Sequence, residues 1–260
     1  MYKTDTVERT LDPDYIPNYL RHAQAAELSQ IKQTLLEISK QKKAKLRILD
    51  IGVGKARVPL LLSKDADIWE RIGFYEGIDN SQACVESAKK ITTENGIADK
   101  VKIELREAKK IAGLTETYDI ILCTYFTAGN FYPSGFSFET DQTVKGKIQT
   151  APTLEENGSF REVFLPAYRS LNPRGELVLG SVYIDNEETR RKQEEFYKKC
   201  GMNVITGPEH TFTATKEGFW SQRFTTEKIL AYFDFVKPEL IRFVSLDKED
   251  FAMMVRIKKV

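Results

Sequence analysis

An acidic residue followed by a glycine-rich loop makes "RILDIGVGKAR" the most informative stretch of the sequence. Asp50 ends an apolar run, and Gly52 and Gly54 follow it one residue apart. Glycines permit backbone angles that other residues resist, and they let a ligand approach the main chain closely. The N–H groups at the start of the next helix favour a carboxylate or a phosphate. The stretch therefore predicts a ligand-binding loop with a carboxylate at its entrance.

The spacing within this loop excludes two common phosphate-binding motifs. A dinucleotide loop has a third glycine three residues after the second, and Arg57 stands at that position. No Gly-Lys-Ser or Gly-Lys-Thr follows at P-loop spacing. A pyrophosphate would gain nothing from Asp50. A ligand that carries both an ammonium and a carboxylate, such as the methionine end of an amino-acid-derived cofactor, would gain from the acid and from the helix start.

Strands and helices alternate along the chain, which places the loop at the edge of a parallel sheet. Apolar runs predict strands at 46–51, 74–78, 101–105, 118–126, 172–183, 239–246 and 251–259. Helical periodicity predicts helices at 15–40, 56–64, 82–95, 159–171, 187–199 and 226–235, and weak alternation predicts a hairpin at 203–224. The order indicates an α/β fold with a doubly wound, mostly parallel seven-stranded sheet, helices on both faces and an antiparallel C-terminal hairpin. Ligands of such sheets bind beyond the carboxyl ends of the strands.

Five segments in order resemble the motifs of the class I S-adenosylmethionine-dependent methyltransferases. "LDIGVGKA" is similar to their D-x-G-x-G-x-G motif, with Ala56 in place of the third glycine, a mild departure because alanine is nearly as small. "YEGIDNS" resembles the second motif and "ELREAKKI" the third. "YDIILCTYF" and "LNPRGELVLGS" resemble the fourth strand and the turn before the fifth. The resemblance covers about 47–181 and implies S-adenosylmethionine as the cofactor.

The resemblance also implies which residues hold this cofactor. Asp79 would accept hydrogen bonds from the ribose hydroxyls, and Glu107 and Ala108 would flank the adenine. Taken alone, Asp79 could instead cap the next helix, and Glu107 could be a solvated charge. The expected cofactor-binding residues are Tyr19, Asp50, Gly52, Gly54, Asp79, Asn80, Glu107, Ala108 and Thr124. We expect residues 1–45 to form an N-terminal helical lid and 46–260 to form one Rossmann-like domain, with substrate-side insertions at about 127–157 and 203–224.

Aromatic residues after the fourth strand predict the acceptor side of the site. Tyr125, Phe126, Phe131, Tyr132, Phe136 and Phe138 could wall an apolar pocket or pack the core beneath the loop. "TAGNF" weakly resembles a glycine-asparagine segment of amino-acid N-methyltransferases, and Asn130 can both donate and accept. The hairpin with His210, Phe219 and Trp220 could close the other side. Tyr125, Asn130 and His210 are therefore the predicted catalytic residues.

Composition narrows the function further. The net charge of +1 argues against a nucleic-acid footprint, and no apolar run is long enough to span a membrane. Three dispersed cysteines and two histidines predict no structural metal site and suit a reducing cytoplasm. We predict methyl transfer to a small molecule, with an amine nitrogen preferred because it needs little base catalysis. The alternatives are an RNA or protein methyltransferase, an O-methyltransferase with a histidine base, and a binding module without activity. The oligomeric state stays open.

Overall fold

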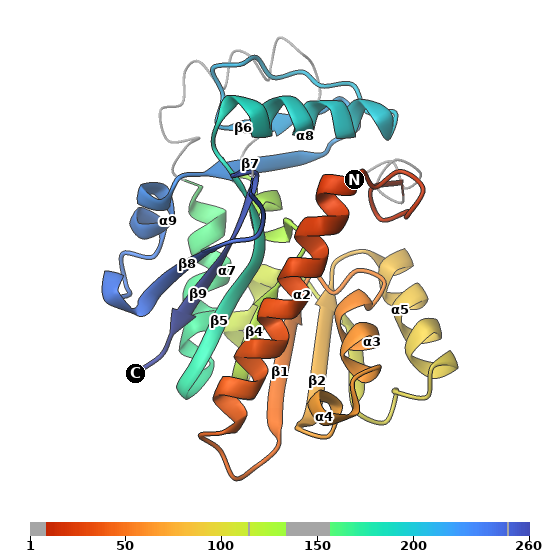
Figure 1. The fold of residues 1–260 in the computed structure, drawn as a ribbon, viewed down its shortest axis with the longest axis vertical. Helices are drawn as coiled ribbons and strands as arrows, with labels where there is room; N and C mark the ends of the chain where they lie inside the picture. The colour runs from red at the N-terminus through yellow and green to blue at the C-terminus, as the bar shows by residue number, and fades with distance from the viewer. Residues whose placement is uncertain (1–8, 114, 134–156, 249) are drawn as a thin grey trace.

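The structure, a computed structural model, describes residues 9–113, 115–133, 157–248 and 250–260 and has a nine-stranded sheet at its centre (Figure 1). The strands are β1 (Leu46–Ile51), β2 (Ile72–Asp79), β3 (Val101–Leu105), β4 (Tyr118–Cys123), β5 (Leu171–Ile184), β6 (Phe212–Ala214), β7 (Trp220–Phe224), β8 (Ile241–Ser245) and β9 (Ala252–Lys258). They follow the order β3-β2-β1-β4-β5-β7-β6, with β9 antiparallel to β5 and β8 antiparallel to β9. The doubly wound fold and its closing hairpin are confirmed.

The number of strands differs from the predicted seven because the hairpin at 203–224 joins the same sheet. Its second strand, β7, runs parallel to the end of β5 and pairs there with Tyr183 and Ile184. The fourth strand also ends three residues earlier than predicted. Tyr125 and Phe126 take left-handed backbone angles, with φ of +50° and +61°, which no extended strand can contain.

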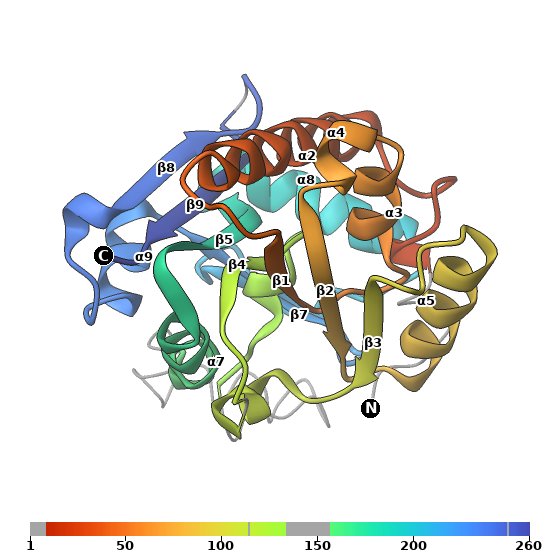
Figure 2. The ribbon, with the colours of Figure 1, turned by 90° about the horizontal axis from the view of Figure 1, so that it is seen from below.

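Helices cover both faces of the sheet (Figure 2). The α-helices are α2 (Asn18–Ser39), α3 (Arg57–Ser63), α4 (Ala66–Trp69), α5 (Gln82–Glu94), α7 (Gly158–Arg169), α8 (Glu187–Lys199) and α9 (Thr226–Tyr232), and the short 3-10 helices are η1 (Ala108–Gly113), η2 (Thr127–Asn130) and η4 (Pro238–Leu240). Side chains of β1 alternate between two cores: Ile48 packs in the core of α2 and α3, and Leu49 in the core of α7 and α9. The same alternation directs Asp50 toward the side of α2 and α3.

Helix α2 lies across the sheet beside α3 (Figure 1). Its buried residues recur at helical spacing, and they include a carboxylate among the apolar side chains: Leu20, Ala23, Glu27, Ile31, Thr34, Leu35 and Ile38. Pro17 precedes the helix in an extended conformation, so the helix begins three residues after the predicted start. None of the described helices combines the length and the apolar character needed to cross a membrane.

The hairpin of β6 and β7, together with α8, lies beyond the carboxyl ends of β1 and β4 (Figure 1). The short helix η2, which follows β4, packs directly against β7. A methyl group at Gly129 would come within 2.8 Å of the carbonyl oxygen of Gln222. The end of β4 is therefore enclosed between the glycine loop and the hairpin, where the fold predicts a ligand.

Replacement of Gly129 tests this close packing. We expect Gly129→Ala to lower the free energy of unfolding by about 1–3 kcal/mol, since the added methyl meets backbone rather than a movable side chain. Urea denaturation measures the change. Gly158→Ala is the matched control, because no described atom lies within 4 Å of the added methyl, and it should change stability by less than about 0.5 kcal/mol. Equal effects of both substitutions would contradict the packing described.

Candidate active site

The glycine loop is held between β2 and η2. The N–H groups of Gly52 and Val53 donate to the carbonyl oxygen of Ile78, at 2.8 and 3.0 Å. Gly52 has φ of +74°, and a methyl group there would come within 2.5 Å of the Thr127 Cγ2 atom. Gly54 has φ of +55°, and no described atom lies within 4 Å of a methyl placed on it. The loop therefore needs glycine for its conformation and leaves room for a ligand beside Gly54.

Ala56, at the position of the third glycine, departs from the motif more than its size suggests. It has φ of +59°, precedes the first residue of α3 and is fully buried. An L-residue in this left-handed conformation costs on the order of 1 kcal/mol, a cost that glycine does not have. The prediction of a mild departure considered side-chain volume alone, and the left-handed backbone conformation of Ala56 adds this cost.

Asp50 is a buried carboxylate with one unsatisfied oxygen. Its side chain is 1% exposed, and Oδ2 accepts a hydrogen bond of 2.6 Å from the Tyr75 hydroxyl. Oδ1 has no hydrogen-bond partner among the described residues. Burial raises the pKa of the Asp50 carboxyl to about 7, although the Tyr75 hydrogen bond and the charge of Arg57 act in the opposite direction. A ligand ammonium would satisfy this oxygen, so the site fits the amino-acid end of S-adenosylmethionine.

Asp79 lies at the end of β2 and faces the same loop. Its Oδ2 atom accepts from the N–H of Gly54 and its Oδ1 atom from the N–H of Ser81, both at 2.9 Å. The cap of α5 is Ser81, whose hydroxyl accepts from the Cys84 N–H, so Asp79 is not the capping residue. Burial is the main cause that raises the Asp79 pKa. The position suits the predicted contact with the ribose, and Asn80 is exposed beside it.

The other predicted cofactor residues lie in different surroundings. Glu107 is exposed and lies 3.5 Å from the Lys110 ammonium, which agrees with the solvated-charge alternative, and Ala108 begins η1 beside it. Thr124 is buried at the end of β4. The Tyr19 hydroxyl donates to the carbonyl oxygen of Lys192 in α8, at 2.9 Å. Cofactor contacts by these four residues stay predictions.

The aromatic residues directly after β4 are packed rather than free. The Tyr125 hydroxyl donates to the carbonyl oxygen of Thr10 at 3.0 Å, and burial raises its pKa. Phe126 is 5% exposed and stacks on Tyr183, with 3.8 Å between ring centroids. For Phe126 the core alternative is the better description. Tyr125 keeps a partly exposed side chain at the turn.

Asn130 and the hairpin aromatics are the residues predicted for the remaining acceptor side. The Asn130 Oδ1 atom is buried and has no hydrogen-bond partner in the described part of the chain. Tyr132 packs edge-on against Trp220 at 6.4 Å and thereby connects the loop after β4 with the hairpin. The His210 Nε2 atom lies 3.1 Å from a Glu209 carboxylate oxygen, at the start of the hairpin. Phe131 packs against Phe164 of α7 and Phe219 against Tyr197 of α8, whereas Phe136 and Phe138 lie outside the described residues.

Two charged residues of the site were missed from the sequence. Glu27 is fully buried, and its Oε1 atom accepts from the Tyr125 N–H at 2.9 Å and from the Ser181 hydroxyl at 2.8 Å. Its Oε2 atom forms an ion pair with Arg57. The acid among apolar residues at helical spacing in α2 was the available signal. Arg57 was used only to exclude a dinucleotide loop.

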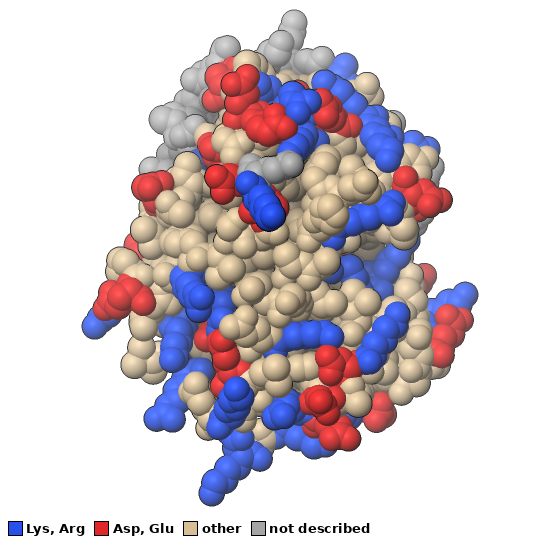
Figure 3. All heavy atoms as spheres, in the orientation of Figure 1, with Lys and Arg blue, Asp and Glu red and all other residues tan. Residues whose placement is uncertain are grey.

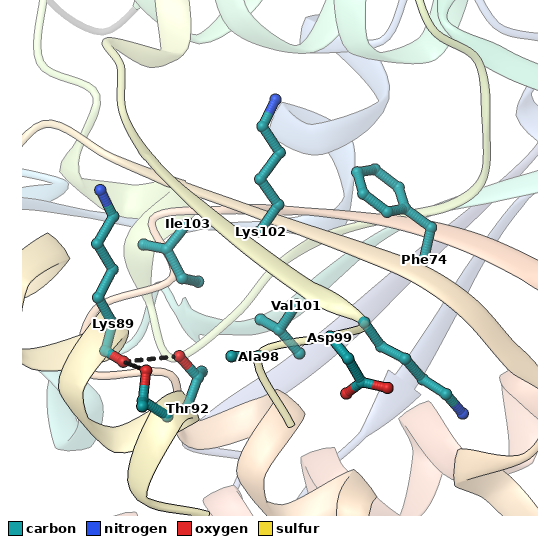
Figure 4. Close-up of a pocket in the computed structure, with 10 residues that line it drawn as sticks. Phe74, Lys89, Thr92, Ala98, Asp99, Val101, Lys102 and Ile103 are labelled. Atoms are coloured by element: carbon teal, nitrogen blue, oxygen red, sulfur yellow. Dashed lines mark hydrogen bonds between the residues drawn. The ribbon is translucent and has the colours of Figure 1, made fainter. Parts of the chain in front are cut away.

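A shallow surface hollow of about 410 Å³ lies elsewhere on the sheet (Figure 4). It is lined by residues from the start of β2 and β3 and the end of α5, among them Phe74, Lys89, Thr92 and Lys102. These strand starts are at the opposite end of the sheet from the glycine loop. The hollow is therefore separate from the candidate site.

A family model described as a methyltransferase domain matches residues 42–234. The chain belongs to this methyltransferase family. One similar solved structure is the CcbJ methyltransferase from Streptomyces caelestis, with a TM-score of 0.56 and 10% identity over 96% of this chain and 99% of that one. A second is an S-adenosylmethionine-dependent methyltransferase from Clostridium acetobutylicum ATCC 824, with a TM-score of 0.55 and 10% identity over 88% of this chain and 90% of that one. A third is S-adenosylmethionine-bound CalS10, an amino pentose methyltransferase from Micromonospora echinaspora, with a TM-score of 0.52 and 14% identity over 90% of each chain. The comparison with curated proteins gives no match. The protein is thus an S-adenosylmethionine-dependent methyltransferase of the class I fold.

Substitution of Asp50 should separate stability from cofactor binding in this methyltransferase. Burial in the folded state raises the pKa of Asp50 above the value of about 4 that it has in the unfolded chain. The ionised carboxylate therefore lowers the free energy of unfolding at pH values above about 4. We expect Asp50→Asn to raise the free energy of unfolding at pH 7.5, on the order of 2 kcal/mol. The same change should weaken S-adenosylmethionine binding by at least about tenfold, because a charged hydrogen-bond acceptor is lost. Thermal denaturation and calorimetry measure the two effects.

Asp119 provides the matched control, because it is a buried carboxylate at the start of β4 whose oxygens have partners. It accepts from the Arg47 N–H at 2.9 Å and from Asn172 at 2.6 Å, and it pairs with Lys42. Asp119→Asn should destabilise the fold and change cofactor affinity by less than about threefold. Loss of stability in Asp50→Asn would contradict the assignment of Asp50 as a strained ligand-binding carboxylate.

Cofactor affinity should also depend on pH through Asp50. An ammonium binds the ionised carboxylate, and a pKa of about 7 leaves about a tenth of Asp50 ionised at pH 6 and about three-quarters at pH 7.5. We therefore expect the affinity for S-adenosylmethionine to increase roughly eightfold between these pH values. Calorimetric titrations at both pH values measure the ratio. A flat profile would show that Asp50 does not receive the ammonium.

Proposed function

We propose that this methyltransferase transfers the methyl group of S-adenosylmethionine to an amine nitrogen of a small-molecule acceptor. The observation that carries the proposal is the buried Asn130 Oδ1 atom, which has no hydrogen-bond partner among the described residues. Asn130 ends η2, and the same helix begins with Thr127 against Gly52 of the cofactor loop. An amine N–H that donates to this oxygen would lie beside the cofactor. An oxygen nucleophile that is already deprotonated has no hydrogen to donate and would leave it unsatisfied.

Methyl transfer to an amine requires the protein mainly to align the acceptor with the cofactor. The cofactor supplies an electrophilic methyl group on its sulfonium, and a neutral amine attacks with its lone pair. An amide oxygen accepts a hydrogen bond but takes up no proton near pH 7, so Asn130 would orient the amine rather than act as a base. Enclosure by η2, the hairpin and the loop after β4 would exclude water and hold the reacting atoms in line. The aromatic contact of Tyr132 with Trp220 supports such an enclosed site.

Charge and comparison support a small acceptor over a polymer. The centre of the face seen in Figure 3 is largely uncharged, acidic and basic side chains are mixed around it, and no broad basic field is visible there. A nucleic-acid substrate would favour such a field. CalS10, which shares the fold, is an amino pentose methyltransferase. We further propose a cytoplasmic location, since Cys123 and Cys200 form no disulfide within the described part of the chain. We also propose that residues 1–45 form a helical cover of the site.

Turnover with paired acceptors tests the proposal. Panels of amino acids, amino sugars and polyamines, each beside its hydroxyl analogue, are incubated with S-adenosylmethionine, and formation of S-adenosylhomocysteine is measured. We expect product with an amine but not with its hydroxyl counterpart. Asn130→Ala should lower kcat roughly 100-fold through misplacement of the amine, with cofactor affinity kept within about threefold. Asn130→Asp, which keeps an acceptor oxygen, should retain more activity.

The same assay distinguishes the alternatives. His210→Gln should change kcat by less than about threefold for an amine acceptor, because no general base is needed. Loss of turnover in His210→Gln, with product from hydroxyl acceptors, would instead indicate an O-methyltransferase whose base is the imidazole beside Glu209. Turnover that requires RNA and falls steeply with salt would indicate a nucleic-acid substrate.

A further inference from the structure

Glu27 occupies an unusual position, because it joins four elements around the cofactor loop through one buried carboxylate. It extends from α2 and contacts the turn after β4 at Tyr125, the strand β5 at Ser181 and the start of α3 at Arg57. Strand β5 makes room for it: a methyl group on Gly180 would collide with the Glu27 Oε1 atom. A fully buried acid costs several kcal/mol unless it is paired and hydrogen-bonded. Residues of several elements therefore contact or make room for this one carboxylate.

Arg57 connects Glu27 with the cofactor-binding acid. Its guanidinium pairs with Glu27, lies 5.6 Å from the centre of the Tyr125 ring and is 27% exposed. It is also close enough to Asp50 for its charge to lower the Asp50 pKa. Yet Asp50 Oδ1 has no hydrogen-bond partner among the described residues. The charged or titratable groups that act on Asp50 are Tyr75 and Asp79 of β2, Arg57 of α3, Glu27 of α2 and Cys123 of β4.

We propose that Glu27 is a positioning residue that keeps Arg57 off Asp50. An arginine beside a buried carboxylate forms a strong forked pair with it when no other acid competes. Such a pair would occupy the oxygen that the cofactor ammonium needs, and binding would have to break it. By holding Arg57, Glu27 leaves Asp50 free for the cofactor. The same carboxylate accepts from the Tyr125 N–H and so fixes the left-handed turn that leads to Asn130.

This inference rests on the assignment of S-adenosylmethionine as the cofactor and not on the identity of the acceptor. Its test is calorimetric titration of the full chain with S-adenosylmethionine alone. Failure of the wild-type protein to bind would refute the cofactor site as a whole. If the wild-type protein does bind, the inference about Glu27 is judged only from the dissociation constants of the variants.

Three proteins are compared: the wild type, Glu27→Gln, and the double variant Glu27→Gln with Arg57→Met. Glu27→Gln frees Arg57 to pair with Asp50, so we expect the dissociation constant to rise by at least about tenfold. The double variant removes the competing guanidinium, and we expect the dissociation constant to return to within about threefold of the wild-type value. A double variant that binds as weakly as Glu27→Gln would overturn the proposal, because a merely structural carboxylate cannot be rescued by a second substitution.

One further measurement covers the case in which Glu27→Gln fails to fold, and another applies where it folds. Replacement of both members of a buried ion pair is often tolerated, so the double variant is then judged alone, and a loss of affinity above about tenfold overturns the proposal. Where Glu27→Gln does fold, the pH at which its affinity is half-maximal should lie below that of the wild type, because Arg57 then keeps Asp50 ionised; an unmoved midpoint counts against the proposal. Ser181→Ala is the control: it removes a hydrogen bond to Glu27 and leaves Arg57 paired, so affinity should change by less than about twofold.

Discussion

The rest of the site depends on one buried carboxylate at the end of the first strand. Asp50 has a single hydrogen-bond donor, Tyr75, and its other oxygen has no partner among the described residues. Water would satisfy such a group outside the protein, and burial removes that water. The protein tolerates the cost because a cofactor that carries an ammonium can supply the missing partner. The buried Asp50 carboxylate thus lowers the stability of the free protein and raises its affinity for the cofactor, as is common at binding sites.

The neighbouring elements are arranged around this constraint. Gly54 leaves open space beside the loop, and Asp79 holds the loop by accepting a hydrogen bond from the Gly54 N–H. Helix α2 contributes Glu27, which binds Arg57 and the turn after β4. That turn starts η2, where the buried Asn130 Oδ1 atom likewise has no partner among the described residues. A cofactor ammonium could satisfy the Asp50 oxygen and an acceptor amine the Asn130 oxygen.

The sheet and the cofactor loop were largely predictable because local patterns encode them. The strands at 46–51 and 101–105 and the helix at 187–199 have the predicted ends, and the helix start is fixed by the cap of Asn186. The end of β4 was not predictable, because Tyr125 and Phe126 favour strands, and only the distant Glu27 shows why they turn. The pairing of β7 with β5 likewise depends on contacts between residues far apart in the chain.

The Asp50 Oδ1 atom, which has no partner among the described residues, is where we expect the amino-acid end of the cofactor to bind. A crystal structure with S-adenosylhomocysteine, the product that keeps this end, tests it most directly. We predict the ligand ammonium within about 3 Å of the Asp50 Oδ1 atom, with Arg57 still paired to Glu27. An Asp50 carboxylate paired with Arg57, or a ligand ammonium bound elsewhere, would contradict the account.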